Sequence, residues 1–209
     1  SDMSLMEVTR GCIWACRFCT AGFIYRPPRL PDLNLTYRSL ENVLAGQGKS
    51  VSTVGLVGPS VTDHPEILSL ARKIVEDGKK LSFSSLRMET LTDELVDLIK
   101  KSGQKTLTVA VDGPSERMRR VINKEATDDF IVEKCQFLTK KGILHLKIYS
   151  IIGLPGETEE DIDHFIALVE RVMKTYVATC SQRGNVGQVT IGLSPLIPKP
   201  GTPFQWHPM

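Results

Sequence analysis

The sequence predicts an α/β fold built on a parallel sheet. Short apolar runs rich in β-branched residues alternate with longer amphipathic runs along the chain. Glycines close the amphipathic runs, as they commonly do at the ends of helices. About six strand–helix units follow one another, and this regular alternation favours parallel strands flanked by helices. Because a closed barrel of this type needs eight units, two architectures remain open: an open doubly wound sheet or an incomplete barrel.

Each expected strand is a short run of mostly apolar or β-branched residues. The run at residues 52–57 is β-branched and apolar and stops at Gly58-Pro59. In either architecture, functional groups gather at the carboxyl ends of the strands. The expected strands are residues 5–8, 52–57, 81–84, 106–111, 144–152 and 189–193.

The expected helices carry apolar side chains at helical spacing. The first is expected over residues 36–45. Thr127 is expected to cap a later helix, and Thr92 and Thr158 are expected to start two others. A polar loop is expected over residues 182–187, before the last strand.

The composition is that of an ordinary globular domain. The chain has 209 residues, 41% of them hydrophobic and 24% charged, with a formal net charge of +2. This balance gives no electrostatic reason to expect nucleic acid or a membrane as the main partner. No signal peptide or apolar run of membrane-spanning length is visible, so a cytoplasmic location is expected. Both ends are abrupt, and we expect residues 1–209 to be a single domain from a longer protein.

Three of the five cysteines, Cys12, Cys16 and Cys19, lie together directly after the first expected strand. A disulfide framework would spread its cysteines, so this group indicates a metal site in a compartment that keeps thiols reduced. The C-x3-C-x2-C spacing provides three thiolates on one short loop. In a 4Fe–4S cluster, three protein ligands leave one iron free to bind a substrate. A zinc site and a chance group of buried thiols are the alternatives.

The remaining cysteines carry no metal prediction. Cys135 lies on an apolar helix stripe and is expected in the core. Cys180 lies near the polar loop and is expected to be a spare residue rather than part of a second site. Trp14 is expected either to shield the metal site or simply to pack.

The loop GCIWACRFCTAG at residues 11–22 resembles the signature of the radical S-adenosylmethionine (SAM) superfamily. Residues 19–27 and 198–206 resemble the branch whose members often carry a cobalamin-binding domain upstream. The methylthiotransferases are similar at a greater distance. The resemblance covers nearly the whole chain and implies a partial (β/α)6 barrel of the TIM type.

The resemblance also implies a chemistry. Cys12, Cys16 and Cys19 would hold a 4Fe–4S cluster that reductively cleaves SAM to a 5′-deoxyadenosyl radical, which abstracts hydrogen from a substrate that the sequence does not identify. Methyl or other group transfer would follow. The implied partners are SAM, the substrate and a one-electron reductant such as ferredoxin or flavodoxin, and cobalamin would be used through a domain outside this chain. An iron–sulfur electron carrier or redox sensor, or a zinc-stabilised βα module, are the alternatives.

The resemblance assigns the methionine end of SAM to three strand ends. The backbone of Gly58-Pro59-Ser60 would accept hydrogen bonds from the methionine ammonium, although the acidic residue of the family motif is absent and a plain turn is an equal alternative. Lys124 resembles the position that supplies a cation to the methionine carboxylate, against the alternative of a solvated surface lysine. Arg87 is a second candidate cation, and Ser84 lies at the same strand end.

The adenosine end of SAM is assigned to the later strands. Asp112 stands where relatives usually have glutamate and would accept from the ribose hydroxyls, directly or through a water. Ile151 and Gly153 would pack against the adenine, in a segment that also reads as a strand exit before a capped helix. The adenine edge would meet the sixth strand end at Pro195 and Leu196 and the backbone of Phe18 just before the last cysteine of the loop.

Overall fold

The computed structural model describes residues 2–45, 51–84, 86–184 and 186–208. Within these residues all strand pairings in the sheets are parallel, and the strands follow sequence order in two ladders, β1-β2-β3 and β4-β5-β6. This arrangement confirms the predicted α/β class. The strands are β1 (Met3–Glu7), β2 (Thr53–Val57), β3 (Lys80–Phe83), β4 (Thr106–Asp112), β5 (His145–Ile152) and β6 (Gln188–Pro195).

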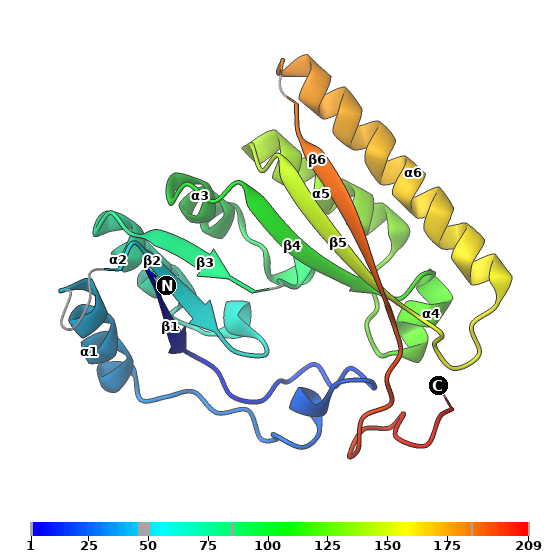
Figure 1. Cartoon of the computed structure of the whole chain (residues 1–209), viewed down its shortest axis with the longest axis horizontal. Helices are drawn as coiled ribbons and strands as arrows, with labels where there is room; N and C mark the ends of the chain where they lie inside the picture. The colour runs from blue at the N-terminus through cyan, green and yellow to red at the C-terminus, as the bar shows by residue number, and fades with distance from the viewer. Residues whose placement is uncertain (1, 46–50, 85, 185, 209) are drawn as a thin grey trace.

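The two ladders join through Leu86, just after β3. Its amide donates to the carbonyl of Thr108 at 3.0 Å, and its carbonyl accepts from the amide of Ala110 at 3.4 Å. This bridge continues the parallel pairing from the first ladder into β4. Figure 1 shows the resulting curved array, with β1 and β6 at its two edges and not paired to each other. A curved parallel sheet in the order 1 to 6 is the incomplete barrel rather than the doubly wound sheet.

Helices cover the outer side of this sheet, and threonine, serine or aspartate side chains cap most of them. Thr92 and Thr127 each accept from a backbone N–H in the first turn, and Thr158 forms a capping box with Asp161. The predicted cap at Thr127 and the predicted helix starts at Thr92 and Thr158 are therefore confirmed. The helices are α1 (Leu33–Leu44), α2 (Ile67–Glu76), α3 (Asp93–Lys101), α4 (Glu116–Val121), α5 (Asp128–Lys141) and α6 (Glu159–Gln182).

Three details differ from the sequence prediction. Helix α1 begins three residues earlier than expected, because Asp32 accepts from the amide of Leu35 and caps it. The short α4, capped by Ser115, was not predicted. Helix α6 runs through Gln182, the first residue of the expected polar loop, and Cys180 is buried in the last turn of this helix.

The larger of two hydrophobic clusters among the described residues lies between the sheet and the helices. Along β5, Leu146 and Ile148 are buried against this core, whereas Lys147 and Tyr149 are exposed on the opposite, concave face. Cys135 is 1% exposed and belongs to the core, as predicted. Among the described residues, no helix combines the length and the hydrophobicity that crossing a membrane requires.

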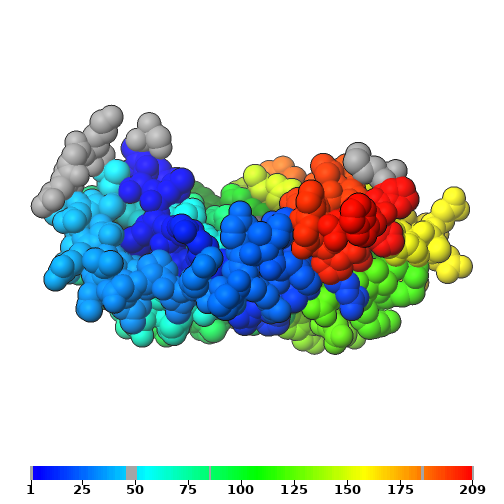
Figure 2. All heavy atoms as spheres, turned by 90° about the horizontal axis from the view of Figure 1, so that it is seen from below, coloured from blue at the N-terminus to red at the C-terminus, as the bar shows by residue number. Residues whose placement is uncertain are grey.

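The carboxyl ends of the strands meet at one end of the molecule, where the chain forms its longest loops. Seen from that end in Figure 2, the loop that follows β1 lies beside the segment that follows β6. Ile24 and Gly201 are close enough that a Cβ added to Gly201 would lie 2.8 Å from the Ile24 side chain. The cysteine loop is thus held over the strand ends, where this fold places its functional groups.

Candidate cofactor site at the carboxyl ends of the strands

The cysteine loop is closed at its base by backbone hydrogen bonds. Arg10 and Arg29 pair in an antiparallel bridge, with N–O distances of 2.9 and 2.8 Å. Inside the loop, the amide of Cys12 donates to the carbonyl of Ala21 at 3.0 Å, and that of Cys19 donates to Cys16 at 2.9 Å. These bonds bring the first and last cysteines of the motif back toward each other along the backbone.

Glycine is required on one side of this loop by its backbone conformation and on both sides by close packing. Gly11 has a φ of +82°, and a Cβ there would lie 2.2 Å from the carbonyl oxygen of Tyr25. A Cβ on Gly22 would lie 2.8 Å from the Cα of Ala15. The glycines that flank the cysteines in the sequence therefore allow a compact loop.

Cys12, Cys16 and Cys19 are free thiols of intermediate exposure. Throughout the part of the chain that the structure describes, no three His, Cys, Asp or Glu side chains converge on a position for a single metal ion. A 4Fe–4S cluster makes a different demand, because each thiolate ligates its own iron atom. Three soft sulfur donors on one glycine-tightened loop fit that demand.

The loop is also anchored to the residues that follow α4. The amide of Arg17 donates to the carbonyl of Ile122 at 3.0 Å. The side-chain amide of Asn123 donates to the carbonyls of Trp14 and Ala15 at 3.0 and 3.2 Å. Asn123 has a φ of +62°, a conformation that asparagine tolerates better than most residues. These contacts fix the cysteine loop against the turn that follows α4.

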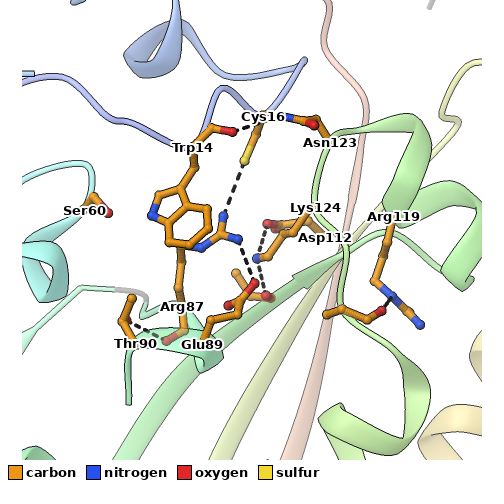
Figure 3. Close-up of polar contacts among 12 residues, drawn as sticks. Trp14, Cys16, Ser60, Arg87, Glu89, Thr90, Asp112, Arg119, Asn123 and Lys124 are labelled. Atoms are coloured by element: carbon orange, nitrogen blue, oxygen red, sulfur yellow. Dashed lines mark hydrogen bonds and ion pairs between the residues drawn. The ribbon is translucent and has the colours of Figure 1, made fainter. Parts of the chain in front are cut away.

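Lys124 is brought back to β4 by that turn (Figure 3). Its ammonium lies 2.7 Å from Asp112 Oδ2 and also donates to the carbonyl of Ala110. The side chain of Lys124 is 2% exposed and that of Asp112 is 16% exposed. Lys124 is therefore a buried partner of Asp112, and the alternative of a solvated surface lysine is wrong. Only part of the path from Asp112 to Lys124 is helical, because α4 covers Glu116–Val121.

A buried arginine braces the segment between Asp112 and Lys124. Arg119 is 0% exposed, and its guanidinium donates to the carbonyls of Ala126 at 2.6 Å and Gly113 at 3.2 Å. It also pairs with Asp128 at the start of α5. Sequence reasoning did not find this residue, because the three partners of its guanidinium are spread over two turns and a helix.

Arg87 connects the third strand end to the cysteine loop. Its Nη1 lies 3.5 Å from Cys16 Sγ, and its Cζ lies 4.0 Å from the centroid of the Trp14 ring. Figure 3 shows Arg87 between Trp14 and Glu89, pointing toward Cys16. Burial raises the pKa of the Cys16 thiol, and the positive charges of Arg87 and Lys124 oppose that shift. Trp14 thus packs against a cation beside the cysteines.

A cavity of about 340 Å³ opens beside these residues. Five residues that the sequence assigned to the adenosine end of SAM line it together: Phe18, Asp112, Ile151, Pro195 and Leu196. The rest of the lining is formed by Tyr149, Ser150, Ser194, Ile197 and Lys199. The lining mixes apolar walls with a few polar groups, as small-molecule sites usually do.

Gly153 is not among the residues that line this cavity. Its amide and that of Leu154 donate to the carboxylate of Glu157, at 2.8 and 3.3 Å. The segment therefore forms the turn that precedes α6, in line with the strand-exit reading, and its predicted contact with adenine stays a prediction.

A second cavity, of about 240 Å³, lies on another side of the cysteine loop. Cys12, Thr9, Ser60 and Asp63 are among its lining residues. Ser60 is buried and donates to Asp63. Gly58 is packed so closely that a Cβ there would lie 2.1 Å from Thr9 Oγ1. This close packing holds the ends of β1 and β2 together. Pro59 and Ser84 are exposed and line neither of these two cavities.

Sequence reasoning missed several side chains of the site. The segment that contains Ile151 and Gly153 resembles a family motif whose first glycine is replaced by Tyr149 here, and that departure was the available signal. Its ring packs on Gly192 so closely that a Cβ there would lie 2.4 Å from Tyr149 Cε1. Glu89, which pairs with Arg87 at 2.7 Å, and Lys199, which lines the larger cavity, gave no signal in the sequence.

Away from the cavities, Asp161 links α4 to α6. Burial would raise the pKa of this carboxyl, but hydrogen bonds from Ser115, Thr158 and Arg117 outweigh it and lower the pKa from 3.8 to about 2. Its side chain is 4% exposed. The carboxylate therefore holds the turn after β4 and the start of α6 together.

Comparison with known proteins places the chain in a family. The family model described as the radical SAM superfamily matches residues 6–169. An uncharacterized protein of Methanocaldococcus jannaschii is 38% identical over 96% of this chain and 42% of its own length. The threonylcarbamoyladenosine tRNA methylthiotransferase MtaB of Bacillus subtilis is 24% identical over 75% of this chain and 37% of its own length. The chain thus spans about two fifths of these relatives.

Solved structures share the fold. The radical SAM methyltransferase TsrM of Kitasatospora setae, with cobalamin and a [4Fe-4S] cluster bound, has a TM-score of 0.69 at 18% identity and covers 97% of this chain and 38% of its own. The cobalamin-dependent SAM radical enzyme OxsB has a TM-score of 0.69 at 14% identity and covers 96% of this chain and 34% of its own. The fold is therefore the partial barrel of these proteins, and by its sequence the chain belongs to the radical SAM superfamily, whose cofactors are a 4Fe–4S cluster and SAM.

Proposed function

We propose that this chain binds a 4Fe–4S cluster through Cys12, Cys16 and Cys19 and binds SAM in the adjoining 340 Å³ cavity. The observation that carries the proposal is the placement of a three-thiol loop over the strand ends, beside a cavity that holds Asp112 and adjoins buried Lys124. Three thiolates leave one iron of such a cluster without a protein ligand. When bound, the cluster supplies the electron that breaks a carbon–sulfur bond of SAM and yields a 5′-deoxyadenosyl radical.

Lys124 orients the methionine carboxylate in this proposal. An ammonium group has three N–H donors, and two of them meet Asp112 and the carbonyl of Ala110. We infer that the third donor serves a ligand carboxylate. Because Lys124 is 2% exposed, water competes little for that donor, and a charge-assisted hydrogen bond there is strong.

Asp112 orients the ribose. Its Oδ2 accepts from Lys124, and its other lone pairs face a cavity that it lines. The pairing fixes the carboxylate before any ligand arrives, which lowers the entropic cost of binding. Phe18, Ile151 and Leu196 supply apolar surface for the adenine and exclude water from it.

The reaction that we propose downstream is hydrogen abstraction followed by methyl or other group transfer. Relatives and structural neighbours with named activities support this class, because MtaB is a methylthiotransferase and TsrM a methyltransferase. Cobalamin would be provided outside these residues, and the electron would come from a one-electron reductant such as ferredoxin or flavodoxin. A cytoplasmic location agrees with three free thiols in one loop.

Anaerobic reconstitution tests the proposal. The chain is loaded with iron and sulfide, reduced with dithionite in the presence of SAM, and assayed for 5′-deoxyadenosine by chromatography. We expect the unmodified chain to form 5′-deoxyadenosine and Cys16→Ala to form none. Cys135→Ala should form as much as the unmodified chain, because Cys135 is a buried thiol far from the loop in sequence. A fully loaded cluster that leaves SAM intact would refute the proposal and favour an electron carrier.

A further inference from the structure

Arg87 makes a contact that binding of the methionine carboxylate does not require. Its guanidinium donates through Nη1 to Cys16 Sγ at 3.5 Å and through Nη2 to Glu89 at 2.7 Å. Both terminal nitrogens are therefore engaged within the chain. In the described residues, Cys16 is the one cysteine of the loop whose sulfur accepts a side-chain hydrogen bond.

Trp14 and Glu89 hold this guanidinium from two sides. The Arg87 Cζ lies 4.0 Å from the Trp14 ring centroid, in the range of a cation–π contact. The side chains of Arg87 and Glu89 are 14% and 24% exposed, so their ion pair is largely shielded from water. Arginine suits this position because its planar group can stack and donate at the same time.

The supports are themselves fixed by hydrogen bonds. Trp14 Nε1 donates to Asp63 Oδ2 at 2.5 Å, and Asp63 also accepts from Ser60. The hydroxyl of Thr90 donates to the carbonyl of Arg87 at 3.0 Å. The chain Ser60–Asp63–Trp14–Arg87 thus runs from the second strand end to a sulfur of the cysteine loop, as Figure 3 shows in part.

We propose that Arg87, clamped by Trp14 and Glu89, is a positioning residue that raises the reduction potential of the cluster through the Cys16 sulfur. The inference rests on the proposed function, in which Cys16 ligates the cluster. Reduction adds one electron from an external one-electron donor and moves no proton. A cationic hydrogen-bond donor on a ligating sulfur stabilises the more negative reduced form, and hydrogen bonds to sulfur are a known determinant of cluster potential.

The test is an EPR-monitored redox titration of the reconstituted chain without SAM. Arg87→Met removes both charge and donor, and we expect its potential to be more negative than that of the unmodified chain. Arg87→Lys keeps the charge but cannot stack and donate together, so a smaller shift in the same direction is expected. Trp14→Ala removes the ring that supports the guanidinium, so its potential should also be more negative. Trp14→Phe keeps a ring there, and its potential should lie close to that of the unmodified chain.

Arg26→Met is the matched control, because Arg26 is an arginine near the same loop that donates to the carbonyl of Ile13 at 2.7 Å rather than to sulfur. Its potential should equal that of the unmodified chain. Iron and sulfide content are measured for every variant, so absence of a cluster in the unmodified chain would overturn the proposed function rather than this inference. If Arg87→Met does not hold a cluster, the reduction potentials of loaded Arg87→Lys and Trp14→Ala provide the test instead. Unchanged potentials in loaded variants would overturn the role of Arg87.

Discussion

Removing either partner of the ion pair between Lys124 and Asp112 should destabilise the protein, and the two losses should differ. Removing one partner of a buried pair costs about 3–5 kcal/mol, because the other charge is left without compensation. Lys124 is 2% exposed, so Asp112→Asn strands an ammonium that water barely reaches. We expect it to lower the free energy of unfolding by about 4 kcal/mol. Asp112 is 16% exposed, so Lys124→Met strands a carboxylate that water partly solvates, and about 2 kcal/mol is expected.

Urea denaturation of the cluster-free chain, followed by far-UV circular dichroism, measures both losses. Asp112 has a φ of +66°, and asparagine tolerates this conformation, so Asp112→Asn tests charge rather than backbone strain. In the double variant neither charge is stranded, and its loss should fall below the sum of the single losses by at least about 1 kcal/mol. Two single variants that lose the same stability would refute the reasoning. So would a double variant whose loss equals the sum of the two single losses.

Three further predictions concern pH, thiol reactivity and packing. Asp161, with a pKa lowered to about 2 from 3.8, contributes stability that is present above pH 3.8 and lost as the pH falls toward 2. Asp161→Asn should therefore remove about 2 kcal/mol at pH 6 and flatten the acid limb of a stability–pH curve. In the native cluster-free chain, a thiol reagent should modify Cys12 and Cys19 within minutes and Cys16 more slowly, because burial raises the pKa of the Cys16 thiol. It should reach Cys135 and Cys180 only on unfolding, because both are buried and burial raises the pKa of Cys135 to about 12. Gly192→Ala should cost about 1–3 kcal/mol by overpacking against Tyr149, and urea denaturation should show most of that loss recovered when Tyr149→Ala is added.

The positions of the strands along the chain could be predicted because each strand shows a local apolar or β-branched pattern. The β-branched run before Gly58 became β2, and the apolar run before Asp112 became β4. Thr92, Thr127 and Thr158 marked the starts of helices because capping is a contact within one turn. The choice between a doubly wound sheet and an incomplete barrel could not follow from periodicity, since it depends on the bridge between Leu86 and β4.

The same distinction holds for the site: positions set by a local motif could be predicted, and contacts made in the tertiary structure could not. The cysteine loop and the strand-end residues around the larger cavity were accessible from motif and position. The partners of those residues were not: Lys124 folds back on Asp112 only because α4 is short and Asn123 adopts a positive φ. The contact of Arg87 with Cys16 spans 71 residues, and no local pattern encodes it. Tyr149 was visible only as a departure from a motif, and its place in the cavity lining depends on its packing on Gly192.

The central claim is that the cluster keeps one iron open for SAM. The most direct measurement is the EPR spectrum of the reduced, fully loaded chain with and without SAM. The account predicts that SAM changes the g-values, because it ligates the cluster itself, and that the change persists in the control variant Arg26→Met. An identical spectrum at saturating SAM, with the cluster intact, would contradict it.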